Sequence, residues 1–208
     1  MNLAKLDSVE LAKLQLHPNE RYVRNARRLL QERAVVGKEL TKAKAKLEEI
    51  LADNPDVTRK LRALWSLYSI DSIDENRLLP LLNHDEEHIR VWAIKLLNDS
   101  GAPSKAALKR FVKMAQTDTA GLVQLELAST LQRLPHARRW ELAAALVSQT
   151  TFANDPVLPL MVWYGINPAV PENRAEALKL IAKCKIPKIR QFIARRLAGE
   201  NGKAEDKQ

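Results

Sequence analysis

Apolar side chains recur along this chain at the spacing of an α-helix, and short polar turns separate the helical segments. Within residues 20–35, one helical face carries Val23, Ala26, Leu29 and Leu30. Alternating β-branched runs of useful length do not occur in the sequence, so no strand is expected. The pattern predicts an all-α protein of roughly eleven or twelve helices.

Turn and capping residues set the limits of the expected helices. We expect helices at 8–16, 20–35, 38–51, 57–68, 75–83, 86–98, 105–116, 120–134, 137–149, 156–165, 171–183 and 186–198. N-caps are expected at Ser8, Asn19, Asp74 and Ser104. In the tenth helix, Asp155 is the expected N-cap, Pro156 the first residue and Gly165 the end.

One arrangement recurs six times: a short polar turn, a helix with Arg or a substitute in its first turn, and an apolar seam. The clearest copies begin at His17 and His84, and they agree at the His, a Glu, an Ala and a Leu pair. Weaker copies begin near Asp53, Thr117, Asn154 and Lys183. Successive starts lie about 30 to 37 residues apart, the length of one helical hairpin. The sequence therefore predicts one α-solenoid of about six hairpins over residues 1–198, followed by a disordered tail at 199–208.

Arginines stand near the first turn of the second helix in several repeats. They are Arg24, Arg59, Arg90 and Arg190, and the acidic residues that could pair with them are Asp56, Asp85, Glu87 and Asp118. We expect a ladder of ion pairs between neighbouring repeats, with ligand binding by these arginines as the alternative.

The repeat pattern resembles HEAT repeats, and three strings carry a narrower resemblance. They are residues 17–33 (HPNERYVRNARRLLQER), 158–168 (LPLMVWYGINP) and 186–197 (IPKIRQFIARRL). These strings are similar to the HEAT segment of the membrane-bound dehydrogenase-like proteins of planctomycete-type bacteria, in which a sugar-dehydrogenase-like β-propeller precedes the array and a c-type haem domain follows it. The resemblance covers about residues 8–198, with departures at Arg21 and in the Lys-rich segment 38–46. It implies a HEAT-like connector module without catalytic residues, which is either a piece of an exported, membrane-associated parent or a free-standing relative of that module.

Basic residues outnumber acidic ones, most clearly near the C-terminus. The chain of 208 residues has 34 Lys and Arg against 25 Asp and Glu, a net charge of +9, which favours acidic partners. The candidate surface for a partner or an anion consists of Lys179, Lys183, Lys188, Arg190, Arg195 and Arg196. This surface would bind nucleic acid, an acidic protein or a membrane surface; the alternative is an ordinary solvated face.

Other chemical motifs in the sequence have structural explanations. His84 and His88 with Glu87 do not follow the order of a zinc-protease motif, and His84 falls in a turn, so no metal site is expected. Cys184 is the only cysteine; neighbouring lysines would lower its thiol pKa, but a structural role is the main expectation. The sequence lacks C-x-x-C-H, so no c-type haem or other cofactor is expected.

Aromatic residues of the second helices and their neighbours could stack a base or fill a groove, or pack between repeats. They are Trp65, Tyr68, Trp92, Trp140, Trp163 and Tyr164. We interpret them as packing residues, because each falls at the spacing of a buried helical face.

These observations predict a non-catalytic, monomeric HEAT-type scaffold that binds a partner protein or neighbouring domains. The second helices are the expected binding face. The alternative is a nucleic-acid-binding helical repeat that uses the basic C-terminal surface, and a third hypothesis is a base-modifying enzyme. No apolar run of transmembrane length and no signal peptide occur in the chain, so direct membrane insertion is not expected and the localisation stays open.

Overall fold

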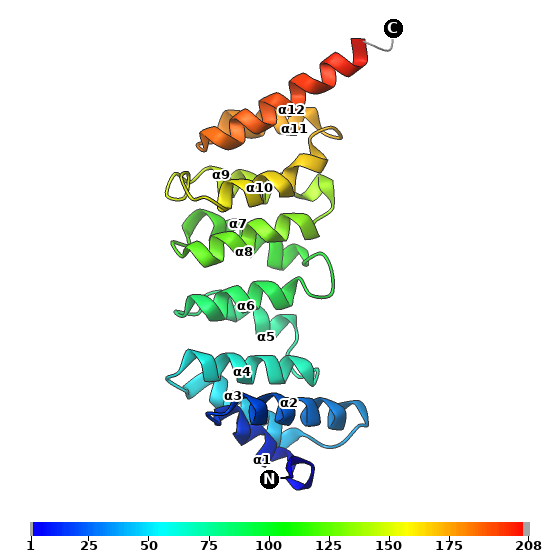
Figure 1. Cartoon of the computed structure of the whole chain (residues 1–208), viewed down its shortest axis with the longest axis vertical. Coiled ribbons are helices and arrows are strands. Elements are labelled where there is room, and N and C mark those ends of the chain that lie inside the picture. The colour runs from blue at the N-terminus through cyan, green and yellow to red at the C-terminus, as the bar shows by residue number, and fades with distance from the viewer. Residues whose placement is uncertain (1, 206–208) are drawn as a thin grey trace. The chain divides into compact units, whose positions relative to one another are not determined.

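The computed structural model describes residues 2–205, and side chains up to residue 199. This part contains twelve α-helices and five short 3-10 helices and has no strand, so the all-α prediction is confirmed. The α-helices are α1 (Ser8–Lys13), α2 (Glu20–Val35), α3 (Thr41–Asp53), α4 (Val57–Ser69), α5 (Glu75–Leu81), α6 (Glu87–Leu97), α7 (Lys105–Thr117), α8 (Gly121–Thr130), α9 (Trp140–Val147), α10 (Leu158–Ile166), α11 (Arg174–Lys183) and α12 (Pro187–Glu205) (Figure 1). Among these described helices, none combines the length and the apolar character that crossing a membrane requires.

The chain divides into two compact units, Met1–Trp92 and Ala93–Gln208, and the boundary falls within α6. The single array expected over residues 1–198 stays a prediction. Helix α12 continues to Glu205, into the segment 199–208 for which the sequence predicted disorder. The remaining residues of that segment, 206–208, lie outside the described residues.

In the first unit, helices pack as antiparallel neighbours and as successive layers. Helix α1 contacts α2, and α3 contacts α4; in addition, α1 contacts α3 and α2 contacts α4. An ion pair joins the second helices of two repeats, because Arg62 Nη2 of α4 lies 2.6 Å from Glu20 Oε2 of α2. Arg62 also donates to the carbonyl of His17, in the turn before α2.

The ladder expected from Arg24 and Arg59 differs from this link. Arg24 pairs with Glu20 of its own helix, and Arg59 pairs with Asp56 three residues earlier. These pairs are local, whereas Arg62, which the sequence pattern did not single out, bridges two repeats. Arg62 reaches α2 from a largely buried position, with 12% of its side chain exposed, whereas the Arg59 side chain is 43% exposed.

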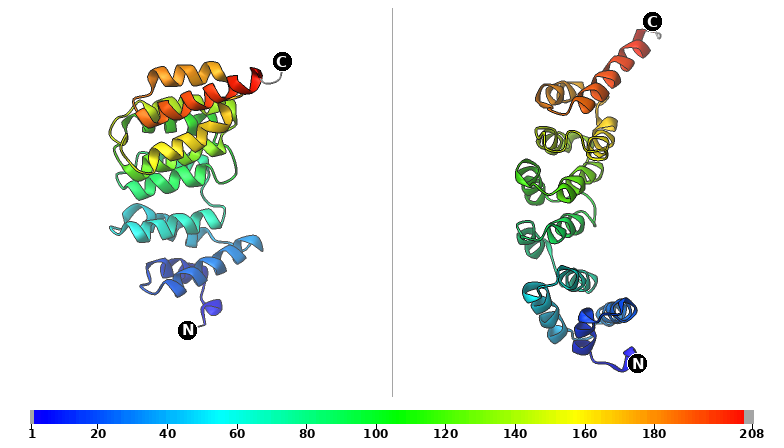
Figure 2. Two further views of the ribbon diagram at one scale, coloured as in Figure 1. Left: turned by 45° about the horizontal axis from the view of Figure 1, so that its top comes forward. Right: turned by 60° about the vertical axis from the view of Figure 1, so that its left-hand side comes forward.

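The second unit consists of two rows of helices. Helix α9 contacts α7 and α11 in one row, and α10 contacts α8 and α12 in the other. Each helix of the first row also contacts the next helix in the chain (Figure 2, right). Apolar side chains without exposed surface fill the space between the rows, among them Phe111, Leu127, Leu142, Val162 and Ile193.

The same hydrogen-bonded turn precedes five of the even-numbered helices. In each turn a side chain accepts a hydrogen bond, 2.8 to 3.0 Å long, from the backbone N–H two residues later. The acceptors are His17, Asn54, His84, Asp118 and Asp155. Each lies within one residue of an expected repeat start. What recurs along the chain is therefore this hydrogen bond. A histidine ring nitrogen, an asparagine amide oxygen or an aspartate carboxylate oxygen can each accept it.

Several expected helix starts agree with the structure. Asn19, Asp74 and Ser104 are the N-caps of α2, α5 and α7. Ser8 is not the N-cap of α1, however. Asp7 caps this helix in a capping box, since Asp7 accepts from the Glu10 N–H and Glu10 accepts from the Asp7 N–H.

Helix α10 differs from its expected form at both ends. It begins at Leu158 rather than Pro156, because the Asp155 carboxylate accepts from the N–H groups of Val157 and Leu158. Gly165 lies inside α10 and does not end it. A Cβ at this position would stand 2.5 Å from Leu131 Cβ, so glycine permits close contact between α10 and the segment after α8.

We expect Gly165→Ala to lower the free energy of unfolding by about 1 to 3 kcal/mol, because Leu131 must move from a packed position. Gly199→Ala is the matched control, since a Cβ there meets no atom within 4 Å. This control should leave stability unchanged or raise it by up to about 1 kcal/mol, as alanine favours helix. Urea unfolding of both variants measures the difference, and equal effects would contradict the close-contact explanation.

His84 makes a pH-dependent contribution to stability that asparagine at the same position should remove. Burial, and then Lys60, lower the pKa of His84, whose Nδ1 must be unprotonated to accept from the Glu86 N–H. As the pH falls below about 6.5, the unfolded chain takes up this proton before the folded chain does, so the free energy of unfolding falls. His84→Asn should keep the turn, as Asn54 does, with a weaker dependence of stability on pH.

Urea unfolding of the wild type and His84→Asn at several pH values between about 7.5 and 5 tests this expectation. The two proteins should have similar stability at the upper end and should diverge as the pH is lowered. Parallel pH profiles would show that the ring nitrogen of His84 does not contribute in this way.

Candidate functional site

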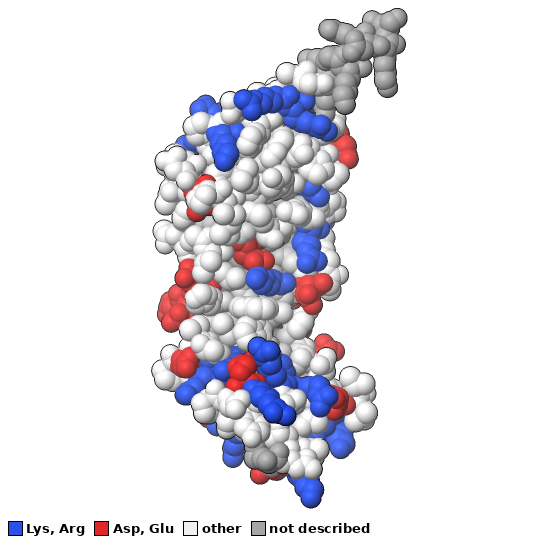
Figure 3. All heavy atoms as spheres, in the orientation of Figure 1, with Lys and Arg blue, Asp and Glu red and all other residues white. Residues whose placement is uncertain are grey.

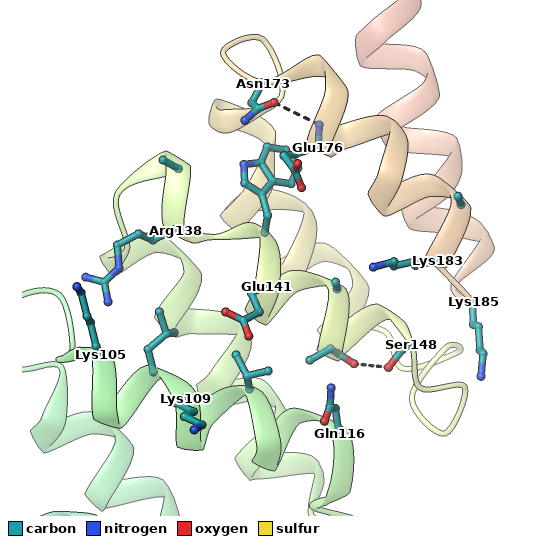
Figure 4. A pocket seen from close by; sticks show the side chains of 17 residues that line it. Lys105, Lys109, Gln116, Arg138, Glu141, Ser148, Asn173, Glu176, Lys183 and Lys185 are labelled. Carbon is teal, nitrogen blue, oxygen red and sulfur yellow. Dashed lines mark hydrogen bonds between the residues drawn. The ribbon is translucent and has the colours of Figure 1, made fainter.

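A groove of about 1280 Å³ runs along α7, α9 and α11 in the second unit (Figure 4). Its floor is α9, which has 8 residues, whereas α7 has 13 and α11 has 10. Small side chains of α9 and of the residues on either side of it line the groove, among them Ala137, Ala144 and Ser148. The middle helix of the row is therefore short and narrow, and its neighbours form the walls.

Arg139 holds the beginning of this floor in place. Its side chain is only 7% exposed; Nε donates to the Leu134 carbonyl at 2.8 Å and Nη1 donates to the Gly165 carbonyl at 2.6 Å. Burial lowers the pKa of Arg139. The guanidinium thus links the start of α9 to α10 through hydrogen bonds to two carbonyls in the protein interior.

Basic side chains occupy both ends of the groove. Lys105 and Arg138 lie at one end, and Lys183 and Lys185 lie at the other (Figure 4). The backbone N–H of Lys185 donates to the Val147 carbonyl at 2.8 Å, which fixes the turn after α11 to the end of α9. The two basic ends therefore belong to segments that hydrogen bonds and helix packing hold in position.

The wall formed by α7 has a regular pattern. Lys105, Lys109, Val112 and Gln116 lie at helical spacing along one stripe of α7, and all of them line the groove. Opposite this wall, Glu176 of α11 forms an ion pair with Lys179 at 2.7 Å. Glu141 extends from α9 between the two basic ends, so the groove contains a central carboxylate (Figure 4).

Trp140 is the aromatic residue of the groove lining, and it is 7% exposed. Its indole Nε1 has no hydrogen-bond partner among the described residues. Since its ring is almost fully buried, Trp140 packs beneath the groove and offers no open face on which a base could stack.

Among the six basic residues predicted as a site, the four on α12 are distributed around that helix. All six are exposed: Lys179, Lys183, Lys188, Arg190, Arg195 and Arg196. On α12, Lys188 and Arg195 lie opposite the buried Ile189 and Ile193, and Arg190 and Arg196 flank this outward face on its two sides. The face seen in Figure 3 carries basic side chains over α12, and it is largely uncharged over α10.

Of these six residues, the groove includes Lys183 alone. Four basic groove residues lie outside the predicted set: Lys185, which follows α11, and Lys105, Lys109 and Arg138, which come from segments far from the C-terminus. Only the i, i+4 spacing of Lys105 and Lys109 was visible in the sequence, and that spacing alone does not distinguish a groove wall from a solvated face.

Cys184 is a structural residue. It is buried, and its thiol donates to the Ile186 carbonyl with an S–O distance of 3.3 Å. Burial raises the pKa of this thiol, although the sequence suggested that neighbouring lysines would lower it. The cause is that Lys183 and Lys185 are exposed while the sulfur lies in the interior.

Aromatic side chains make contacts between neighbouring even-numbered helices. Trp65 of α4 packs edge-on against Trp92 of α6 with 4.8 Å between ring centroids, and Arg27 of α2 lies 5.2 Å over Trp65. In the second unit, Trp163 of α10 lies 5.4 Å from Phe192 of α12. For Trp65, Trp92 and Trp163 these geometries agree with the packing role preferred from the sequence. For Tyr164 that interpretation is wrong, since this residue is 58% exposed.

Metal-ligating side chains do not converge in the described part of the chain, where no group of three His, Cys, Asp or Glu residues could hold an ion. No protein-family model, curated protein or solved structure matches the chain.

We expect Arg139→Met to lower the free energy of unfolding by about 2 to 4 kcal/mol, because two carbonyls lose a charged donor in the interior. Arg110→Met is the control, since Arg110 is an exposed residue of α7 outside the groove lining, and its effect should stay within about 0.5 kcal/mol. Thermal or urea unfolding gives both values. A small effect at Arg139 would show that water replaces the guanidinium without cost.

Proposed function

We propose that this chain is a HEAT-like α-solenoid that serves as a non-catalytic scaffold and binds a partner protein or neighbouring domains. The observation that carries the proposal is the turn repeated before five even-numbered helices, together with the two rows of helices in the second unit. Repeats of this kind bury a continuous core by stacking and act through the surface that the stack presents.

The groove supports a binding role. It is a wide depression on the first helices of the repeats, α7, α9 and α11, rather than on the second helices that the sequence favoured. The ionisable side chains with shifted pKa values serve structural contacts: Cys184 hydrogen-bonds a carbonyl, and Glu126, whose pKa burial raises, pairs with Lys95. These features favour recognition over chemistry as the function of the module.

The resemblance to dehydrogenase-like proteins suggests which partners to test first. In that architecture, the array would connect a sugar-dehydrogenase-like β-propeller to a c-type haem domain, and both would contact it. The alternative is nucleic-acid binding, which the exposed basic residues of α12 favour.

We expect the full chain to form a 1:1 complex with at least one of these two modules when each is produced separately. Size-exclusion chromatography with light scattering measures the complex, and each module alone is the control. The same chain should pass through immobilised DNA and RNA at about 0.15 M salt. Binding to neither module, combined with nucleic-acid retention that falls steeply with salt, would replace the scaffold proposal by its alternative.

A further inference from the structure

The groove of the second unit has an apolar floor between charged walls. Val112 of α7 and Ala144 of α9 contribute half-buried apolar surface, and the buried Leu108 and Ala145 pack directly beneath it. Basic side chains stand on both sides of this floor, on α7 and at the end of α11 (Figure 4). A ligand that fills the groove must therefore place apolar groups against this strip and anionic groups near the cations on either side of it.

The charges of the lining residues indicate that the ligand carries negative charge. Five cations line the groove, Lys105, Lys109, Arg138, Lys183 and Lys185, against two carboxylates, Glu141 and Glu176. One of the carboxylates, Glu176, is already paired with Lys179, which lies outside the lining. The surplus of cations favours a ligand rich in carboxylates or phosphates.

The size of the groove favours a peptide segment over a small molecule. Its volume of about 1280 Å³ exceeds the range typical of small-molecule pockets. The eight residues of α9 give a floor about 12 Å long, which matches about two turns of helix or four residues of extended chain. A short segment of a partner protein therefore fits the floor.

Three features favour a peptide over nucleic acid. Trp140 is buried and offers no ring for base stacking. Glu141 stands between the basic ends, where it would repel a phosphate backbone but could accept a hydrogen bond from a peptide N–H. The apolar floor has no counterpart in a sugar-phosphate chain, whereas aliphatic side chains would pack on Ala144 and Val112.

We propose that this groove binds an acidic, amphipathic segment of a partner protein, with aliphatic side chains on the α9 floor and carboxylates against the lysines of the two walls. The proposal rests on the scaffold function and specifies the partner chemistry of that surface. Lys109 lies on the wall formed by α7, and Lys183 lies on the opposite wall, at the end of α11. A segment bound between these two lysines therefore crosses α9.

A dodecapeptide display library, selected on the full chain, tests this assignment. Selected peptides should combine an excess of Asp and Glu with Leu, Ile or Val. Their affinity, measured by fluorescence anisotropy, should fall at least about tenfold in the double variant Lys109→Glu/Lys183→Glu. The double variant Lys113→Glu/Lys188→Glu makes the same charge change at exposed positions outside the groove lining and should stay within about twofold of wild type.

A third variant separates shape from charge. Ala144→Phe fills the floor without altering any charge and should also weaken the selected peptides about tenfold. Circular dichroism and thermal unfolding establish that each variant is folded; if Ala144→Phe is not, the two charge variants decide the question alone.

The outcomes separate this inference from the proposed function. Selected peptides that are not acidic, or that bind both double variants equally, overturn the groove assignment, as does a selection that enriches no peptide. Groove-dependent binding of a dodecathymidine oligonucleotide with no acidic peptide selected would assign the groove to nucleic acid instead. If a module still binds in the complex experiment above, the scaffold proposal survives these results. If neither module binds and nucleic acid is retained with a steep salt dependence, both proposals fall.

Discussion

The structure depends on a turn in which a side chain accepts a hydrogen bond from the backbone two residues later. This turn directs the chain into five of the even-numbered helices, and it occurs in both units. Three chemically different side chains satisfy it, a histidine ring, an asparagine amide and an aspartate carboxylate. The requirement is an acceptor of the right reach rather than a particular residue, which explains why the same turn recurs with different side chains.

Close packing gives each repeat its place beside the next. In the first unit, Arg62 and Glu20 connect second helices, and Trp65 packs against Trp92 on the same row. In the second unit, Gly165 admits Leu131, and Arg139 reaches the carbonyl of that same glycine. One glycine therefore serves two contacts: it removes a side chain that would clash with Leu131, and it provides an acceptor for the buried guanidinium.

The candidate site follows from differences among the repeats rather than from their similarity. Helix α9 is shorter than its neighbours α7 and α11, and alanine side chains line the part of the groove that α9 forms. The row of α7, α9 and α11 therefore has a depression at its middle helix. The cations that surround this depression come from α7, from the segment before α9 and from the end of α11. In the proposed complex, helix packing would fix the positions of these contacts before an acidic segment binds, which lowers the entropic cost of binding.

The sequence by itself determined the helical class, the repeat period and most helix starts, because these follow from local periodicity and from hydrogen bonds between residues close in the chain. The start of α2 at Glu20, capped by Asn19, is an example. Only the tertiary structure decided the role of Gly165, the burial of Cys184 and the grouping of Lys105 and Lys109 with Lys183. These features depend on which helices become neighbours and how closely they approach, and side chains far apart in the chain carry no local signal of that contact.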